Sequence, residues 1–575
     1  MTAVRRLRRR PLPAAVDGGG WPDALPPLLR RIYASRGATS LDAARPRLAA
    51  LPRPDGLLDI DRASALLADA IARERRILVV GDFDADGATA CALAVRGLRL
   101  LGARDVRHAV PNRVVHGYGL SPALVAELAP LRPDLLVTVD HGIACHAGVE
   151  AARALGWQVL VTDHHLPGER LPPADAIVNP NRPGDAFPAK ALAGVGVVFY
   201  VLLALRAHLR AAGRAGGDAD LARLLDLVAV GTVADLVPLD PVNRALVGAG
   251  LRRLRAGQGC AGLMALVEVA GRQAATLGAA DIGYAVGPRL NAAGRLEDMA
   301  LGIECLLCDE PAQARALARR LDAINRERRS VQDAMLEEAE RALAARIEAA
   351  GDGRASVCAF DPGWHPGVVG LVASKLKERL HRPVVAFAPA APGSTQLRGS
   401  ARSIPGFHVR DALAAVDVRQ PGLIERFGGH AMAAGLTLDA ARVGEFQAAF
   451  DAVAAAMLDP ATLEATLDSD GALAPHEFDR LHAEALRDGG PWGQGFPEPL
   501  FDGEFAVADW RVVGERHLRM TLRAEGVARP LPAIHFGGWR GDAPPSRARL
   551  GYRLQPDDYR GGDAVQLVVE HLEAC

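Results

Sequence analysis

The chain has 575 residues, with 67 basic and 68 acidic side chains and a hydrophobic content of 49%. That length is too great for a single hydrophobic core, so we expect a globular protein of three or four domains. The near-zero net charge excludes a polycation that binds nucleic acid over its whole surface, so any such contact must come from a local groove.

The apolar pattern divides the chain into five segments. Residues 1–56 are rich in proline and arginine, and we expect a lead-in that adds nothing to a core. Strand and helix patterns alternate over 57–310, which predicts an α/β domain built on a parallel sheet. Residues 311–350 form one helical pattern that would bridge two lobes, and 351–460 predict a second, smaller α/β domain. Short strands over 461–575 predict a β-barrel such as an OB-fold.

The N-terminus and the cysteines indicate a cytoplasmic protein. Five arginines between positions 5 and 10 predict a solvated basic arm, and Pro11-Leu12-Pro13 follows them where a secretory signal would have its apolar region. No run approaches the length that we expect of a membrane span, so we predict no membrane contact. Seven scattered cysteines, an odd and sparse set, fit a reducing compartment.

Three short apolar runs, at 77–80, 135–139 and 159–162, each end in acidic or histidine residues. Such runs suit strands buried on both faces of a parallel sheet, where ligands bind at the carboxyl ends of the strands. Carboxylates gathered there repel one another unless cations lie between them. Carboxylates with an imidazole suit Mn²⁺ or Mg²⁺, and two such ions would suit phosphoester hydrolysis. The residues after the runs are Asp82, Asp84 and Asp86, then Asp140 and His141, and then Asp163, His164 and His165.

The first acidic segment is ambiguous by itself. An acidic stretch after a strand can be a solvated turn, and this one also resembles the start of the haloacid-dehalogenase phosphatases. The later acids and the adjacent histidines favour a functional site, because burying three polar groups at a strand end is costly without an external partner.

Longer motifs resemble those of the DHH phosphoesterase superfamily. Within it, the chain is similar from about residue 57 onward to the single-strand-specific 5′→3′ exonucleases of bacteria. This resemblance implies a DHH domain, a linker helix, a DHHA1 domain and an OB-fold, in that order. The motifs are GDFDADGATA at 81–90, PNR at 111–113, GYGL at 117–120, TVD at 138–140, DHH at 163–165, LDLVAVGTVADLVPL at 225–239, GPRLNAAGRL at 287–296 and FGGHAMAAG at 427–435.

The resemblance also implies roles for single residues. For the last metal-binding carboxylate we favour Asp226 over Asp235, and His165 and His430 would contact the scissile phosphate while Asp163 completes the DHH signature. The implied metal ligands are Asp82, Asp84, Asp86, Asp140, His164 and Asp226. The implied DNA and phosphate ligands, on loops rich in glycine, are Arg113, Arg289, Asn291, Ser400 and Arg402.

Two positions depart from the family pattern. His141 stands where asparagine is usual, and it could act as an extra donor behind the ligands or reach the metal itself. Phe496 also replaces a usual asparagine, and we expect a structural position there. In the barrel, Trp510, His517, Tyr552 and Tyr559 could either stack on bases or fill the core.

The implied function is a metal-dependent exodeoxyribonuclease of DNA repair and recombination. Single-stranded DNA would pass between the DHH and DHHA1 domains, and two Mn²⁺ or Mg²⁺ ions would support release of 5′ mononucleotides. We expect a bacterial, nucleoid-associated monomer that works beside a helicase and a single-strand-binding protein. The alternatives are a phosphodiesterase of oligoribonucleotides or cyclic dinucleotides, which the barrel and the long helix disfavour, and a DNA-binding scaffold without activity, which the complete ligand set disfavours.

Overall fold

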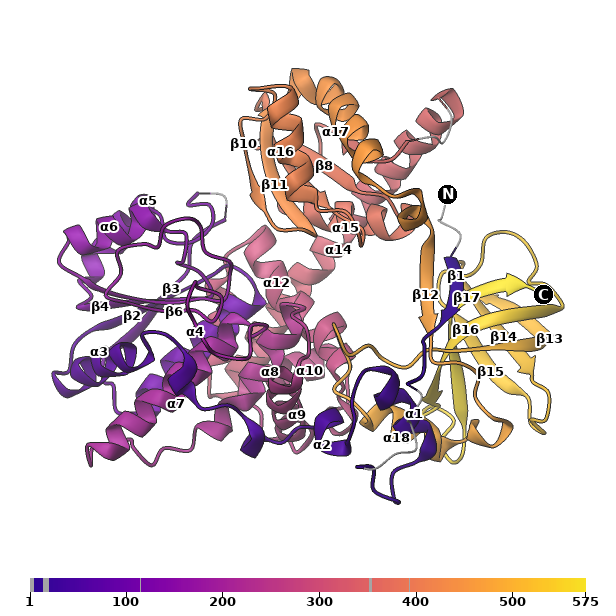
Figure 1. Ribbon diagram of the computed structural model, residues 1–575, viewed down its shortest axis with the longest axis horizontal. Helices are drawn as coiled ribbons and strands as arrows, with labels where there is room; N and C mark the ends of the chain where they lie inside the picture. Colours follow the sequence, from indigo (N-terminus) through magenta and orange to yellow (C-terminus); the bar gives the residue numbers. More distant parts are fainter. Residues whose placement is uncertain (1–4, 14–19, 114, 351–353, 392) are drawn as a thin grey trace. The chain divides into compact units, whose positions relative to one another are not determined.

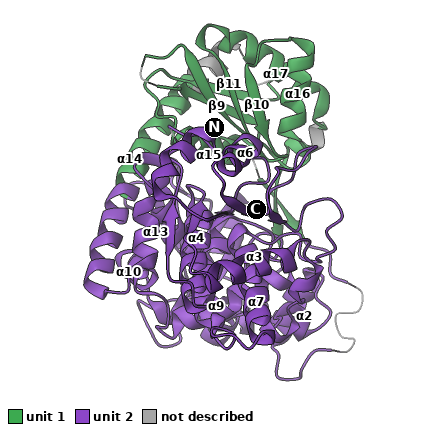
Figure 2. Ribbon diagram, turned by 90° about the vertical axis from the view of Figure 1, so that its left-hand side faces the viewer, with its two compact units in different colours: residues 1–9, 326–469 green, residues 10–325, 470–575 purple. Residues whose placement is uncertain are grey.

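The structure is a computed structural model that describes residues 5–13, 20–113, 115–350, 354–391 and 393–575. The chain divides into two compact units, coloured separately in Figure 2. One unit contains residues 10–325 and 470–575, and the other contains residues 1–9 and 326–469. The predicted start of the second α/β domain, at residues 351–353, lies outside the described residues.

The larger unit contains the predicted parallel sheet. Its five strands lie in the order β3-β2-β4-β5-β6, and every neighbouring pair is parallel. β3 lies outside β2, so the strand order reverses between β2 and β4, which is where ligands bind in sheets of this kind. The strands are β2 (Ile77–Gly81), β3 (Val106–Ala109), β4 (Leu135–Val139), β5 (Gln158–Thr162) and β6 (Ala176–Val178).

Helices cover both faces of this sheet, as its continuous apolar strands predict. Side chains alternate along a strand, so Ile77 and Val79 face one cluster while Leu78 and Val80 face the other. The first cluster contains α3 (Ile60–Ala72), α4 (Ala85–Leu100) and α7 (Gly194–Ala211), and the second contains α5 (Pro122–Leu128) and α6 (His146–Ala154).

Helix α7 corrects the expectation that no apolar run reaches the length of a membrane span. Its 18 residues are long and apolar enough to cross a membrane by length and composition. However, 61% of its residues are buried inside the unit, and core helices pass the same test.

A group of helices completes the α/β part of the larger unit. A five-residue π-helix, Ile282–Val286, lies between α11 and α12. The GPRLNAAGRL segment, predicted as a loop, is helix α12, since Pro288 occupies the first turn where its missing N–H costs nothing. The helices are α8 (Leu225–Ala234), α9 (Pro241–Arg255), α10 (Ala261–Val269), α11 (Ala279–Asp281), α12 (Gly287–Leu296) and α13 (Ala300–Leu307).

The N-terminal segment is part of the core of the larger unit, which corrects the expectation of a lead-in. Helix α1 (Pro27–Ser35) buries Leu28, Leu29 and Ile32, and α2 (Leu41–Ala44) follows it. The Tyr33 hydroxyl donates a hydrogen bond to the Gly489 carbonyl at 2.7 Å. These contacts join residues before the sheet to residues just before the barrel, which no local pattern could indicate.

Phe496 lies in this same region and is structural, as expected. It is buried, and its ring stacks on that of Trp492 at 5.3 Å. The Arg244 guanidinium lies over the Phe496 ring, 4.2 Å from its centroid, and forms a cation–π pair with it. Phenylalanine at this position therefore contributes apolar packing and a cation–π contact.

The C-terminal strands form the predicted barrel, which Figure 1 shows in yellow. The barrel is closed, in the order β13-β14-β15-β17-β16, and α18 (Arg480–Asp488) packs against β16. Its strands are β13 (Phe501–Val513), β14 (His517–Arg523), β15 (Leu531–His535), β16 (Arg547–Pro556) and β17 (Val565–Ala574).

The smaller unit contains a five-stranded mixed sheet in the order β10-β11-β9-β8-β7. The 40-residue helix α14 (Pro311–Ala350) begins in the larger unit and continues into this one. Its other elements are β7 (Val357–Phe360), α15 (Val369–Leu380), β8 (Val384–Pro389), β9 (Gln396–Arg402), α16 (Val409–Arg419), β10 (Arg426–Gly429), β11 (Ala433–Asp439) and α17 (Val443–Met457).

Residues 5–9 of the basic N-terminal arm form a strand. Strand β1 (Arg5–Arg9) pairs in parallel with β12 (Ala465–Ser469) in a two-stranded ribbon. Arg8 forms an ion pair with Asp468 at 2.7 Å, and Arg6 forms one with Glu464 at 3.0 Å. Both side chains remain largely exposed, at 72% for Arg6 and 66% for Arg8, so these arginines are solvated as predicted, although they lie on a paired strand.

Candidate metal and phosphate site

The carboxyl ends of β2, β4 and β5 bring the predicted acids and histidines together. Asp82 follows β2, and Asp84 caps α4 by accepting a hydrogen bond from the Gly87 N–H at 3.0 Å. Asp86 therefore lies in the first helical turn, and the three acids do not continue an extended strand. Gly87 permits this turn because a Cβ there would lie 2.6 Å from the Asp82 backbone.

A further glycine, Gly194, makes room for the carboxylates. The Asp86 carboxylate accepts backbone hydrogen bonds from Gly194 at 2.6 Å and Val195 at 3.0 Å, at the start of α7. A Cβ on Gly194 would lie 2.5 Å from the Asp140 carboxylate, so the start of α7 can lie this close to Asp140 only because residue 194 is glycine. Asp140 itself has φ of 65°, a left-handed conformation that is strained for aspartate and typical of functional sites.

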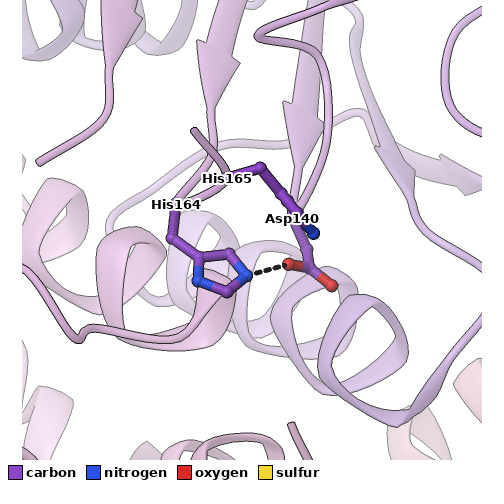
Figure 3. Close-up of side chains that lie close together, drawn as sticks. All are labelled: Asp140, His164 and His165. Carbon is purple, nitrogen blue, oxygen red and sulfur yellow. Dashed lines mark ion pairs between the residues drawn. The ribbon is translucent and has the colours of Figure 1, made fainter. Parts of the chain in front are cut away.

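His164 lies among these carboxylates. Its Nε2 atom is 3.1 Å from an oxygen of Asp140, shown in Figure 3, and 3.5 Å from an oxygen of Asp235. The ring forms a hydrogen bond with the backbone of Leu192, and its Nε2 atom has no hydrogen-bond partner among the described residues. Burial, and then the nearby His165, lower the pKa of His164 to about 4, so the ring is neutral at pH 7. A neutral imidazole aimed at carboxylates is a metal ligand in form.

Asp235, and not Asp226, belongs to this cluster, so the preference for Asp226 is wrong. Asp226 lies within α8, where its carboxylate accepts a hydrogen bond from the Cys260 N–H at 2.7 Å. Its charged neighbours are Arg253 and Arg96, whereas those of Asp235 are Asp86, Asp84 and His165. Asp226 therefore holds the start of α10, and Asp235, at the C-terminal end of α8, completes the acidic group.

The carboxylates are too close together to be ionised without a cation. Burial, and then Asp84, raise the pKa of Asp86 to about 7. Burial and neighbouring acids also raise the pKa values of Asp82, Asp140 and Asp235 well above the usual range for a carboxylate. These are the shifts that a bound divalent cation would reverse.

The cluster also fits a cation in its geometry. There are three sets of candidate ligands, and within each set the ligand atoms all lie within 4.8 Å of one another. Buried atoms of Asp82, Asp140 and His164 have no hydrogen-bond partner among the described residues. Oxygen ligands with one imidazole suit Mn²⁺ or Mg²⁺. The sets are Asp82, Asp84 and Asp140; Asp86, His164 and Asp235; and Asp140, His164 and His165.

Asp163 orients His165. The Asp163 carboxylate accepts hydrogen bonds from the N–H groups of Ile143, His164 and His165 and from the His165 ring at 2.8 Å. Burial alone would raise the pKa of Asp163, but these bonds hold it far below its usual range. Burial likewise opposes the charge on His165, yet the bond to Asp163 raises its pKa to about 9, so this imidazole is cationic at pH 7.

Tyr118 is a neighbour that we did not single out from the sequence. Its hydroxyl lies 3.3 Å from Nδ1 of His165, and its ring meets both the His165 and Phe83 rings edge to face. The signal available in the sequence was an aromatic residue between two glycines, Gly117 and Gly119, and both glycines have positive φ in the structure.

His141 lies behind the cluster and outside the sets of candidate ligands. Its Nε2 donates a hydrogen bond to the Val80 carbonyl at 3.0 Å. Burial lowers the pKa of His141 to about 4, so it is neutral. His141 therefore connects the ends of β4 and β2. Of the two roles considered for it, the structure favours a hydrogen-bond donor behind the ligands over a metal ligand.

The predicted phosphate ligands of the larger unit differ in their surroundings. The Arg113 guanidinium lies 3.9 Å from the centroid of Phe83 and acts on the charge of Asp82, so it belongs to the site. Arg289 is only 8% exposed, and its guanidinium contacts Asp322 and the Ala285 carbonyl. Arg289 thus joins α12 to α14, and the prediction that it binds phosphate is wrong. Asn291 accepts a hydrogen bond from the Ala85 N–H at 2.8 Å, which holds the acidic turn, and its phosphate contact stays a prediction.

Ser400 and Arg402 lie on strand β9, which corrects the prediction of a loop. Glycine and serine have low strand propensity, so the RGSARS segment resembles a turn in sequence. On a strand, residues two apart face the same way, so both polar groups share one face. Gly435 and Gly428 continue the Ser400 row across β11 and β10, so that part of the face carries no side chains. His430 follows β10 and is exposed.

The barrel aromatics separate into core and surface. Tyr552 is buried and fills the core. Trp510 is 37% exposed and stacks on Trp539 at 5.6 Å, beside a second pair of rings, His517 and Phe536. Tyr559 is fully exposed.

Comparisons with known proteins match this architecture. The model of the DHH family N-terminal domain matches residues 76–232, the DHHA1 domain matches 352–456 and the RecJ OB domain matches 469–571. The single-stranded-DNA-specific exonuclease RecJ of Dickeya dadantii is 50% identical over the full length of both chains. The chain belongs to the RecJ family.

Two further RecJ proteins support this assignment. The RecJ exonuclease of Escherichia coli is 48% identical over 99% of both chains. The crystal structure of Thermus thermophilus RecJ with Mn²⁺ has a TM-score of 0.79 and 32% identity, and the match covers 99% of this chain and 80% of that one. A second structure of that RecJ, at a TM-score of 0.75, contains Mg²⁺. The predicted fold class is confirmed.

Proposed function

We propose that this protein is a metal-dependent exonuclease that degrades single-stranded DNA from its 5′ end and releases 5′ mononucleotides. One observation carries the proposal: the buried oxygens of Asp82 and Asp140 and the Nε2 of His164 lack hydrogen-bond partners among the described residues, and each residue belongs to a candidate set whose ligand atoms lie within 4.8 Å of one another. In a chain that is 50% identical to a single-strand-specific exonuclease, such a set supports phosphodiester hydrolysis.

Two ions are proposed, because two of the candidate ligand sets have no residue in common. Asp82, Asp84 and Asp140 would hold one ion, and Asp86, His164 and Asp235 would hold the other. Bound divalent ions supply an activated water and neutralise charge on the scissile phosphate. The chain itself contributes a cationic His165, oriented by Asp163, which can donate a hydrogen bond to a phosphate oxygen.

Phosphates of the DNA strand would meet arginine and hydroxyl groups. Arg113 is proposed as a ligand of the strand near the acids. Ser400 and Arg402 are proposed as ligands of the 5′ end, with exposed His430 as a further phosphate contact. The stacked rings of Trp510 and Trp539 suit bases farther along the strand, because stacking on aromatic rings is tolerant of sequence.

The partners and location follow from the substrate. An enzyme restricted to single strands needs another protein, a helicase, to open a duplex, and free strands in a cell are covered by a single-strand-binding protein. We therefore propose a monomer that works with both in DNA repair and recombination, at the nucleoid in the bacterial cytoplasm.

Digestion of end-labelled DNA tests the proposal. Single strands labelled at either end, and the same sequences as blunt duplex, are incubated with Mn²⁺ and sampled over time. The 5′ label should appear at once as mononucleotide, while the 3′ label shortens gradually and the duplex persists. Early mononucleotide from the 3′ label, or ready digestion of the duplex, would contradict the polarity or the strand specificity.

A matched variant distinguishes an enzyme from a DNA-binding scaffold. Asp140→Ala removes a carboxylate common to two ligand sets. An exonuclease should then lose nearly all turnover and still bind single strands. A scaffold would have no turnover to lose, and its binding would be unchanged.

A further inference from the structure

Ser374, on α15, contacts Arg402 directly. Its Oγ accepts a hydrogen bond from Nε of Arg402 at 3.2 Å and donates one to the Gly370 carbonyl at 3.0 Å. The second bond commits the hydroxyl proton to the previous helical turn, so a lone pair of the oxygen is directed at Arg402.

The other edge of the same guanidinium is also held. Nη1 of Arg402 donates to Oγ of Ser400 at 2.9 Å and to the Ala401 carbonyl at 2.8 Å. Bonds to both Nε and Nη1 define the plane of the group, whereas an unanchored arginine samples many rotamers. A planar guanidinium binds phosphate best when its orientation is set in advance.

Gly370 allows the helix to lie this close. A Cβ at position 370 would be 2.9 Å from both Nη2 of Arg402 and Oγ of Ser400. The arrangement therefore depends on the absence of a side chain one helical turn before Ser374.

We propose that Ser374 is a positioning residue, which fixes the guanidinium of Arg402 so that Arg402 and Ser400 bind a terminal 5′ phosphate. This inference rests on the proposed function. It implies that the enzyme distinguishes a 5′-phosphorylated strand from a 5′-hydroxyl strand, and that the distinction depends on the Ser374 hydroxyl. Helix stability gives no reason for serine here, since alanine is the better helix former.

The test compares KM and kcat for one oligonucleotide with a 5′ phosphate and with a 5′ hydroxyl. In Ser374→Ala the KM for the phosphorylated strand should rise about five- to tenfold, as expected for loss of the net contribution of one ordinary hydrogen bond. Its kcat and its KM for the hydroxyl strand should stay within about twofold. Ser374→Thr, which keeps a hydroxyl able to bond the previous turn, should restore the preference.

Two further variants separate positioning from folding. Gly370→Ala adds the Cβ that meets both phosphate ligands, so it should abolish the preference for the phosphorylated strand. Ser394→Ala removes an exposed hydroxyl that bonds only to backbone groups of its own turn in the same unit, and should change neither substrate. Melting temperatures near that of the unaltered protein would exclude unfolding.

The outcomes are separable from those of the proposed function. If the unaltered protein digests single strands but shows no preference for a 5′ phosphate, or if Ser374→Ala affects both substrates equally, the inference is wrong and the function stands. If the unaltered protein digests no DNA, the function is wrong. The inference is then decided by affinity of the two oligonucleotides for the Asp140→Ala protein with and without Ser374→Ala.

Discussion

The Nε2 atom of His164 lies 3.5 Å from a carboxylate oxygen of Asp235, although the two residues come from a strand end and a helix end that are well separated in the chain. Asp235 thus supplies the acid that the sheet alone does not provide. It also identifies which of two acids near α8 belongs to the site.

Replacing Asp235 should therefore disable the enzyme, while replacing Asp226 should not. For Asp235→Asn we expect a loss of kcat of more than about 100-fold, because a metal ligand should cost more than the outer partners of metal ligands do. Asp226→Asn keeps an oxygen that can accept from the Cys260 N–H and should retain activity within a few-fold. Turnover of a labelled single strand and Mn²⁺ binding by calorimetry measure both. Comparable losses in the two variants would contradict the assignment.

Removing divalent ions should make stability depend on pH. The acids of the cluster hold protons more tightly in the folded, metal-free protein than in the unfolded chain, where the pKa of aspartate is about 3.9. A group whose pKa is raised in the folded state contributes stability that is lost as pH rises. For Asp86 this loss begins near pH 4, at the pKa of the unfolded chain, and continues through pH 7, near its folded pKa. Bound cations offset this loss, so the gain in melting temperature from Mn²⁺ over EDTA should be larger at pH 8 than at pH 5.5. A gain that is equal at both pH values would contradict the metal site.

Phe496→Ala should destabilise the larger unit. The change removes a buried ring that stacks on Trp492 and lies under Arg244, and truncation of a buried phenylalanine costs about 3–5 kcal/mol. Phe536→Ala is the matched control, because that ring is 63% exposed on the barrel and should cost little. Thermal unfolding compares the two, and the turnover of folded Phe496→Ala protein should be normal. Equal melting temperatures would show that the position is not structural.

Trp510→Ala should weaken binding of long single strands without changing chemistry. Loss of one stacked base costs about 1–3 kcal/mol, so Kd should rise roughly tenfold or more. Leu481, exposed on α18, gives a control substitution to alanine away from the stacked rings. Fluorescence anisotropy with the Asp140→Ala protein measures binding without digestion. An unchanged Kd for Trp510→Ala would show that the stacked pair of Trp510 and Trp539 stabilises the barrel and does not bind DNA.

The parts of the site that could be predicted are those that depend on local pattern. Apolar runs followed by Asp82, Asp140 and Asp163 define strands whose ends must meet in a parallel sheet. The choice between Asp226 and Asp235 could not be made in this way. At about 100° per residue, these positions lie on opposite sides of a helix axis, and only the packing of α8 shows which side faces the acids.

Other errors have the same origin in distant contacts. Arg289 is a plausible phosphate ligand until Asp322 of another helix is seen to hold its guanidinium. Ser400 and Arg402 lie in a segment with the composition of a turn, and its neighbours β8 and β11 make it a strand. In both cases the deciding partner lies outside the window in which a sequence pattern can be seen.

The ribbon of β1 and β12 has a consequence for synthesis of the protein. Arg8 and its partner Asp468 are 460 positions apart, and Tyr33 and Gly489 are 456 apart. At about 5–20 residues per second, a ribosome needs roughly 20 to 90 s to make the intervening chain. For that time the first strand and helix α1, with its apolar face, wait without their partners. The N-terminus is thus made first but reaches its native place among the last, and a chaperone that holds α1 should raise the yield of native protein.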